Sequence, residues 1–195
     1  MASTNRPRRD EEVLSAAARV FHARGYAGTS VQDVADELGI LKGSLYHYIS
    51  SKEDLLFRLL DGTHAEVSRI LEEASALDAP PLERLREYVR AQVAFCLGNL
   101  ERVAVYHHDL ERLGEERRRD IVGRRRSHER FVTALLAEAQ AEGLVSESED
   151  PALLTRCVFG TMILTYNWFR VGRDDPETVA AECAEFAIRG VTGGD

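Results

Sequence analysis

A short polar segment in the first quarter of the chain has side chains that could contact nucleic acid. Lysine can pair with phosphates, and serine and histidine can donate hydrogen bonds to phosphates or base edges. A tyrosine offers a ring for thymine methyl groups, and glycine lets the backbone come close. A lysine at a helix start favours a phosphate there. The candidate DNA-contact residues are Thr29, Lys42, Gly43, Ser44, Tyr46, His47 and Lys52.

Two short helices must position these residues. Thr29–Gln32 has a capping-box pattern, which predicts a helix that Gly39 ends after about nine residues. A second helix is predicted from about Lys42 to Tyr48. Helices this short are not stable alone, so they must pack on each other and on a third helix over about 10–24. A tight glycine-containing turn between them predicts a helix-turn-helix, whose second helix enters the major groove.

The rest of the chain also reads as helical, because Ala, Leu, Glu and Arg dominate and apolar residues recur every three or four positions. Ser50–Glu53 is a second capping pattern and opens a long helix. Further helices are predicted over about 81–97, 101–112, 116–142, 151–171 and 176–190. The prediction is an all-α fold of nine helices, preceded by a flexible basic arm over 1–9.

Charge and composition narrow the function classes. The 195 residues carry a net charge of −8, which argues against a chain that is basic throughout but leaves room for a local nucleic-acid site. Residues 1–59 hold eight basic and eight acidic side chains, so the acidity belongs to the remainder. No apolar run is long enough to span a membrane, and the start lacks the apolar core of a signal peptide. Three scattered cysteines suggest reduced thiols, and we expect a cytoplasmic protein without membrane contact.

The segment Ile40–Tyr48, followed by Ser51-Lys-Glu-Asp-Leu55, resembles the TetR family of transcriptional regulators. Upstream, Phe21, Gly25-Tyr26, Thr29-Ser30, Val34-Ala35 and Gly39 fit the same pattern, and Ile49 stands where the family usually has Phe. The resemblance implies a helix-turn-helix DNA-binding domain over 10–52 and a ligand-binding and dimerisation domain over 53–195. It further implies a homodimer that binds a palindromic double-stranded operator as a repressor, and a small-molecule effector that releases it.

The effector class is indicated more weakly. Val103–Arg112 and Asn167–Gly172 resemble regulators of lipid and steroid catabolism that sense acyl-CoA thioesters. Aromatic and apolar side chains could line a cavity while arginines meet an anionic group. A core role for the aromatics, and an uncharged lipophile as effector, are the alternatives. The candidate ligand-binding residues are Phe95, Arg102, Tyr106, Met162, Tyr166, Trp168 and Arg170.

The last two predicted helices each carry an amphipathic stripe. In the resembled family these helices pair with their mates in a four-helix bundle, although a domain core would give the same pattern. The candidate dimer-interface residues are Val158, Phe169, Val179, Cys183 and Phe186.

An enzyme and a protein-interaction module are the competing classes. We find no catalytic constellation, no phosphate-binding glycine loop and no metal-ligand spacing, and we expect no cofactor. His107 and His108 are adjacent, so they point about 100° apart on a helix and do not easily bind one metal ion. Arg117–Arg119 and Arg124–Arg126 lie among acidic residues, which predicts an ion-paired face; a second nucleic-acid patch or a phosphate clamp is the alternative. An interaction module would leave the polar segment at 42–47 unexplained.

Overall fold

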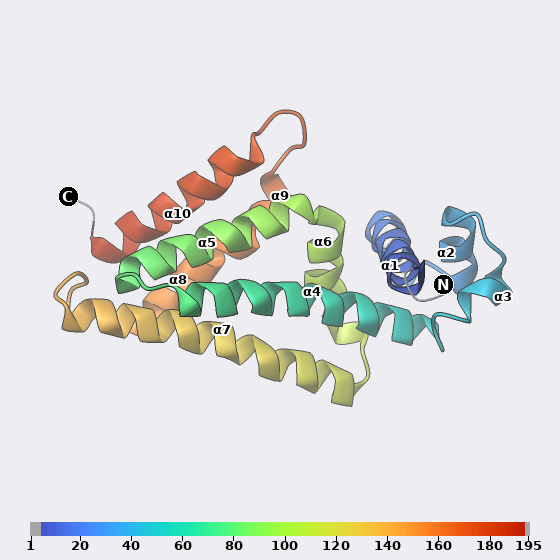
Figure 1. Cartoon of the computed structure of the whole chain (residues 1–195), viewed down its shortest axis with the longest axis horizontal. Coiled ribbons are helices and arrows are strands. Elements are labelled where there is room, and N and C mark those ends of the chain that lie inside the picture. Colours follow the sequence, from blue (N-terminus) through green and yellow to red (C-terminus); the bar gives the residue numbers. More distant parts are fainter. Residues whose placement is uncertain (1–4, 194–195) are drawn as a thin grey trace. The chain divides into compact units, whose positions relative to one another are not determined.

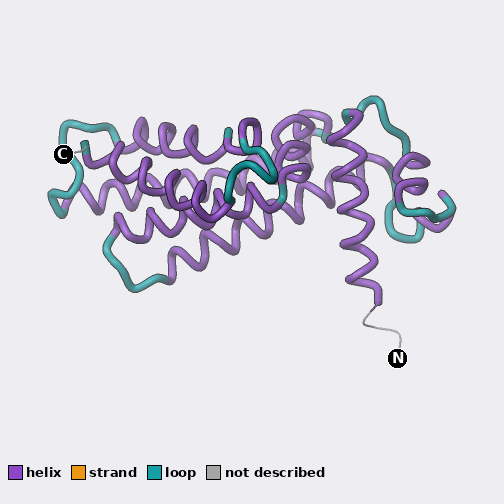
Figure 2. Tube along the Cα trace, turned by 90° about the horizontal axis from the view of Figure 1, so that it is seen from above, coloured by secondary structure: helices purple, strands orange, loops and turns teal. Residues whose placement is uncertain are grey.

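The computed structural model describes residues 5–193, and within them Figure 2 shows helices and loops without a strand. The all-α prediction is confirmed. Among the described helices, none is long and apolar enough to cross a membrane. The elements, labelled in Figure 1, are α1 (Asn5–Arg24), α2 (Val31–Glu37), α3 (Lys42–Leu45), α4 (Lys52–Ala76), α5 (Pro81–Gly98), α6 (Leu100–Asp109), the 3-10 turn η1 (Leu110–Arg112), α7 (Glu115–Ala141), α8 (Pro151–Ile163), α9 (Thr165–Trp168) and α10 (Pro176–Thr192).

The chain folds into two compact units. Unit 1 comprises the residues up to His64 together with Glu101–Ile121, and unit 2 comprises Ala65–Leu100 together with the residues from Val122 onward. Helices α4 and α7 each contribute residues to both units. Packing therefore groups α6 and the start of α7 with the helix-turn-helix, whereas the sequence placed them in the second domain.

The core of unit 1 explains why two very short helices persist. Phe21 of α1, Val34 of α2 and Leu45 of α3 are all buried, and Leu55 and Leu59 of α4 are buried as well. Because α2 and α3 have 7 and 4 residues, this burial rather than helix propensity stabilises them.

Helix α1 begins earlier than predicted. It starts at Asn5, so residues 5–9 belong to a helix and the prediction of a flexible arm is wrong for them. Arg8 and Arg9 both pair with Glu12, one turn further along, which supports the added turn. Residues 1–4 of the predicted arm lie outside the described residues.

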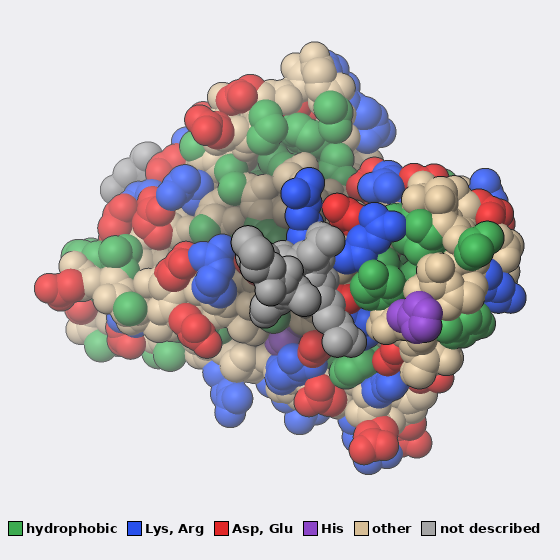
Figure 3. All heavy atoms as spheres, turned by 45° about the vertical axis from the view of Figure 1, so that its right-hand side comes forward, with side chains coloured by type: hydrophobic (Ala, Val, Ile, Leu, Met, Phe, Trp, Pro, Cys, Tyr) green, Lys and Arg blue, Asp and Glu red, His purple; other side chains and the backbone are tan. Residues whose placement is uncertain are grey.

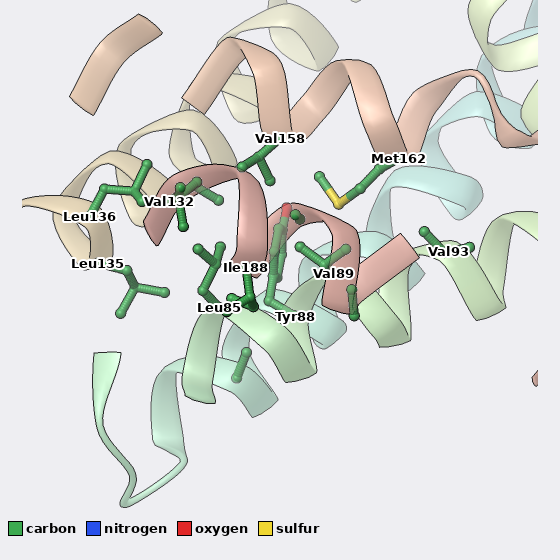
Figure 4. Close-up of a cluster of buried hydrophobic side chains, with 14 of the residues drawn as sticks. Leu85, Tyr88, Val89, Val93, Val132, Leu135, Leu136, Val158, Met162 and Ile188 are labelled. Atoms are coloured by element: carbon green, nitrogen blue, oxygen red, sulfur yellow. The ribbon is translucent and has the colours of Figure 1, made fainter. Parts of the chain in front are cut away.

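The core of unit 2 gathers around α5. Figure 4 shows Tyr88 and Val89 of α5 facing Val158 and Met162 of α8, with Ile188 of α10 beside them. The helix predicted over 151–171 is divided into α8 and α9 at Leu164. There the Thr165 hydroxyl donates to the Met162 carbonyl oxygen at 2.8 Å, a local bond that competes with helix continuation.

Candidate functional site

A capping box fixes the start of α2. The N-cap is Ser30, whose hydroxyl oxygen accepts from the Asp33 backbone N–H, while the Asp33 carboxylate accepts from the Ser30 backbone N–H at 2.7 Å. The Ser30 hydroxyl also donates to the Asp33 carboxylate at 2.6 Å, and this bond together with the one from the Ser30 N–H lowers the pKa of Asp33, with Arg24 contributing. The predicted box at Thr29–Gln32 is thus wrong by one residue. Both partners lie one position later, Ser30 in place of Thr29 and Asp33 in place of Gln32.

The turn between α2 and α3 is closed by a glycine in the left-handed region. Gly39 has φ of 65°, which L side chains adopt at a cost. Its N–H donates to the Asp36 carbonyl, and the Ile40 N–H donates to the Ala35 carbonyl, which is the Schellman arrangement. The predicted glycine stop is confirmed, and this turn fixes the direction in which α3 leaves.

Helix α3 presents polar side chains outward and apolar ones inward. Lys42, Tyr46 and His47 are exposed, Ser44 is half-buried, and Leu45 is fully buried. Ile49, at the position where the family usually has Phe, is also buried. The predicted contact residues on this helix therefore lie where a nucleic acid can reach them.

Two of the three acidic residues on α2 pair with basic residues of α1. Arg19 pairs with Glu37 at 2.8 Å, and Arg24 pairs with Asp33 at 2.9 Å. From Leu38 to Lys52 the chain contains no acidic residue. Figure 3 shows basic and acidic side chains interspersed over the face that it presents. The field of nearby carboxylates is thereby reduced around α3.

Lys52 and Thr29 have more structural engagement than predicted. The Lys52 ammonium lies 4.1 Å from the centroid of the Tyr26 ring, a cation–π contact. Burial lowers the pKa of Lys52, while Asp109 acts in the opposite direction. Thr29 is buried and its hydroxyl donates to the Tyr26 carbonyl at 2.9 Å, so its side chain supports the loop before α2, and its contact with DNA stays a prediction.

The second capping pattern also lies one residue later than predicted. The Asp54 backbone N–H donates to the Ser51 hydroxyl oxygen, and the Ser50 N–H donates to the Asp54 carboxylate at 2.9 Å. The helix accordingly opens at Lys52, with Glu53 and Asp54 in its first turn. Lys52 is therefore the first residue of α4.

Residues 101–121 are fastened to the rest of unit 1 by polar contacts. Arg102 pairs with Glu11 of α1 and its side chain is only 14% exposed, while its role as an anion-binding arginine stays a prediction. Tyr106 is buried, with its hydroxyl 3.4 Å from Nδ1 of His64. The Gly114 N–H donates to the Glu53 carboxylate at 3.1 Å.

The predicted ion-paired face at the start of α7 is confirmed for its first three arginines. Arg117 lies near Glu53 and Asp54 of α4, with its guanidinium 4.6 Å from the Phe57 ring centroid. The two arginines that follow pair with acidic residues of η1 and α7: Arg118 with Glu111 and Arg119 with Glu115.

The remaining predicted ligand residues belong to unit 2 and have different surroundings. Met162 is buried in the hydrophobic core, and Phe95 packs against the same core. Tyr166 is half-buried, whereas Trp168 is 45% exposed. The Arg170 guanidinium donates to the carbonyls of two preceding residues at 3.1 and 3.0 Å, which holds the end of α9. Unit 2 therefore brings only Phe95 and Met162 together in one apolar cluster.

A surface groove of about 580 Å³ runs between α8, α9 and α10. Its apolar lining includes predicted dimer residues Val179, Cys183 and Phe186, together with Leu164 and Trp168. Phe186 is 61% exposed.

The other two predicted dimer residues, Val158 and Phe169, are buried in the core of unit 2. They are thus occupied by intrachain packing, as the alternative core interpretation allowed.

Two family models match this chain. Residues 13–59 match the model described as bacterial regulatory proteins, tetR family, and residues 78–191 match the tetracyclin repressor-like C-terminal domain. The latter covers more than half of the chain. The chain belongs to the TetR family. The resemblance inferred from Ile40–Leu55 is thereby confirmed, and with it the assignment to a family of transcriptional regulators.

Individual TetR-family relatives match over nearly the whole chain. The HTH-type transcriptional repressor KstR2 of Mycolicibacterium smegmatis is 30% identical over 190 residues, covering 94% of this chain and 91% of its own. The structure of the ketosteroid transcriptional regulator KstR2 of Mycobacterium tuberculosis has a TM-score of 0.88 at 29% identity and 94% coverage of both chains. AibR in complex with isovaleryl coenzyme A and operator DNA has a TM-score of 0.82 at 28% identity, covering 96% of this chain and all of its own (100%). These relatives support the resemblance to regulators that sense acyl-CoA.

The cysteines of this TetR-family chain differ in accessibility. Cys96 is buried, which raises its thiol pKa to about 12, whereas Cys157 is exposed and Cys183 is half-buried. Across residues 5–193, we find no group of three or more His, Cys, Asp or Glu side chains that could hold a metal ion.

Proposed function

We propose that this TetR-family chain is a repressor that binds a palindromic DNA operator and is released by a small amphipathic effector. The observation that carries the proposal is the arrangement of α3, whose Leu45 is fully buried while Lys42, Tyr46 and His47 are exposed. A helix held in this way can enter the major groove, with the polar side chains contacting phosphates and base edges. Because its target is chromosomal DNA, we expect the repressor to act in the cytoplasm.

A homodimer accounts for the exposed apolar surface of unit 2. Large apolar side chains rarely form an exposed groove in a monomer, and the groove of α8–α10 includes Leu164, Trp168 and Phe186. A two-fold axis through such a surface would pair each groove with its copy and present two α3 helices to a palindrome. We therefore assign Val179, Cys183 and Phe186 to the interface and omit the buried Val158 and Phe169.

The proposed effector is an acyl-CoA or another amphipathic lipophile. The relative AibR, which was solved with isovaleryl coenzyme A, supports this class. Phe95 and Met162 would offer apolar surface, as in typical ligand sites. The other predicted ligand residues stay candidates: Arg102, Tyr106, Tyr166, Trp168 and Arg170. A ligand that prefers the non-DNA-bound state by ~3 kcal/mol would release the operator more than a hundredfold.

DNA binding is tested by fluorescence anisotropy with the DNA upstream of the chain's own gene. We expect wild type to bind a defined duplex and Lys42→Ala to bind more weakly. Arg69→Ala is the matched control, because it also removes one exposed positive charge but lies in unit 2. Equal losses in both variants, or no preference over random DNA, would contradict the proposal.

The effector is tested by titrating the protein–DNA complex with acyl-CoAs, the matching free acids and neutral lipophiles. Release by the CoA thioesters would support the acyl-CoA assignment. Release by neutral lipophiles alone would reject its anionic part, and release by none of them would reject the amphipathic effector.

A further inference from the structure

Leu41 directly precedes α3 and is 80% exposed. Its backbone is well anchored, since the Leu41 carbonyl accepts hydrogen bonds from the N–H groups of Ser44 and Leu45 at 2.9 and 3.3 Å. The nearby Leu45 and Ile49 are buried, so Leu41 is the exposed one of the three aliphatic side chains in 41–49. An exposed leucine at the start of α3 gains nothing from burial in the free chain, so its apolar surface is available to another molecule that α3 meets.

The surroundings of Leu41 indicate what that molecule is. Among the described residues of unit 1, Leu41 and Tyr46 are the exposed large hydrophobic side chains, so no apolar patch of the kind that protein partners cover surrounds them. The neighbouring side chains Lys42 and Ser44 are a cation and a hydroxyl, and the segment from Leu38 to Lys52 lacks acidic residues. A polyanion whose surface offers small isolated apolar groups fits this composition.

Thymine offers such a group. Its C5-methyl lies in the major groove and is recognised by apolar side chains, and recognition helices contact base edges with their N-terminal residues. We infer that Leu41 is a specificity-determining residue that packs against a thymine methyl in each operator half-site. The inference rests on the proposed DNA-binding function and adds to it the base that Leu41 reads, thymine, and the group that it contacts, the C5-methyl.

The size of the effect follows from the methyl group. Burial of one methylene-sized apolar group corresponds to about a fourfold change in Kd. A palindrome presents the contact twice, so removing both methyl groups should weaken binding about fifteenfold.

The test uses uracil, which differs from thymine by the absence of this methyl alone. An operator is first selected from random duplexes by the full-length wild-type chain, and each thymine is then replaced by uracil in both half-sites. Wild type is expected to lose about fifteenfold at one thymine position. Leu41→Ala is expected to bind the thymine operator more weakly and to show no further loss on uracil at that position. Leu77→Ala is the matched control, since it removes an exposed leucine from the loop before α5 in unit 2.

Three outcomes would overturn the inference. In the first, no uracil substitution weakens wild type; in the second, Leu41→Ala responds to uracil as strongly as wild type does. The third is an equal loss on every duplex, which would mean that Leu41 contacts the backbone. If the wild-type chain selects no duplex at all, the proposed function itself is overturned. Circular dichroism of each variant shows whether a loss of binding comes from misfolding.

Discussion

Replacing Phe186 by alanine should weaken the proposed dimer strongly. A phenylalanine offers roughly 200 Å² of surface, and at 61% exposure about 120 Å² remains for a partner to cover. At about 25 cal/mol per Å² this is worth about 3 kcal/mol per copy. Alanine keeps about a third of the contact, so the loss is about 4 kcal/mol over two copies, or about a thousandfold in the dimer Kd.

The assay is sedimentation velocity over a dilution series of the wild type and the variant. Leu144→Ala is the control, because it also truncates an exposed apolar side chain of unit 2 but lies in the loop between α7 and α8. Operator affinity should fall together with dimerisation, since a monomer engages one half-site only. A Phe186→Ala chain that stays dimeric at the concentrations where wild type does would refute this interface.

Four further outcomes are expected. Lys52→Ala should weaken binding to all DNA sequences alike and reduce the slope of log K against log salt by about one to two per dimer, measured by anisotropy at several salt concentrations. A thiol reagent should label the exposed Cys157 rapidly at pH 8, while Cys96, whose burial raises its pKa to about 12, should react only on unfolding, as mass spectrometry would show. Gly62→Ala should raise the free energy of unfolding by about 1 kcal/mol in thermal melts, because Gly62 lies within α4 and an added Cβ would clash with no neighbouring side chain or other element. Bonds to the N-cap serine lower the pKa of the Asp33 carboxylate. The ionised carboxylate therefore stabilises the folded chain above about pH 4, and this stabilisation is lost as pH falls through the folded-state pKa. Asp33→Asn should flatten this acid-dependent loss of stability in denaturant titrations.

The helix-turn-helix could be predicted in detail because its determinants are local. Gly39 ends α2 through its own backbone conformation, and the spacing of Val34, Leu45 and Ile49 decides which sides of the short helices are buried. Capping was predictable in kind but not in register. Thr29 and Ser30 are both suitable caps, and only the folded loop, in which Thr29 bonds to Tyr26, leaves Ser30 for the cap.

In the second half of the chain the sequence determined helices and amphipathic stripes, whereas tertiary structure decided what each stripe contacts. Val158 and Phe186 belong to similar apolar patterns, yet Val158 enters the core and Phe186 remains 61% exposed. The sequence makes Arg102 a candidate anion ligand, and only folding places Glu11, which is far away in sequence, beside it. Helical periodicity specifies a face from neighbours within a few residues, but the partner of that face comes from distant parts of the chain, which packing alone brings together.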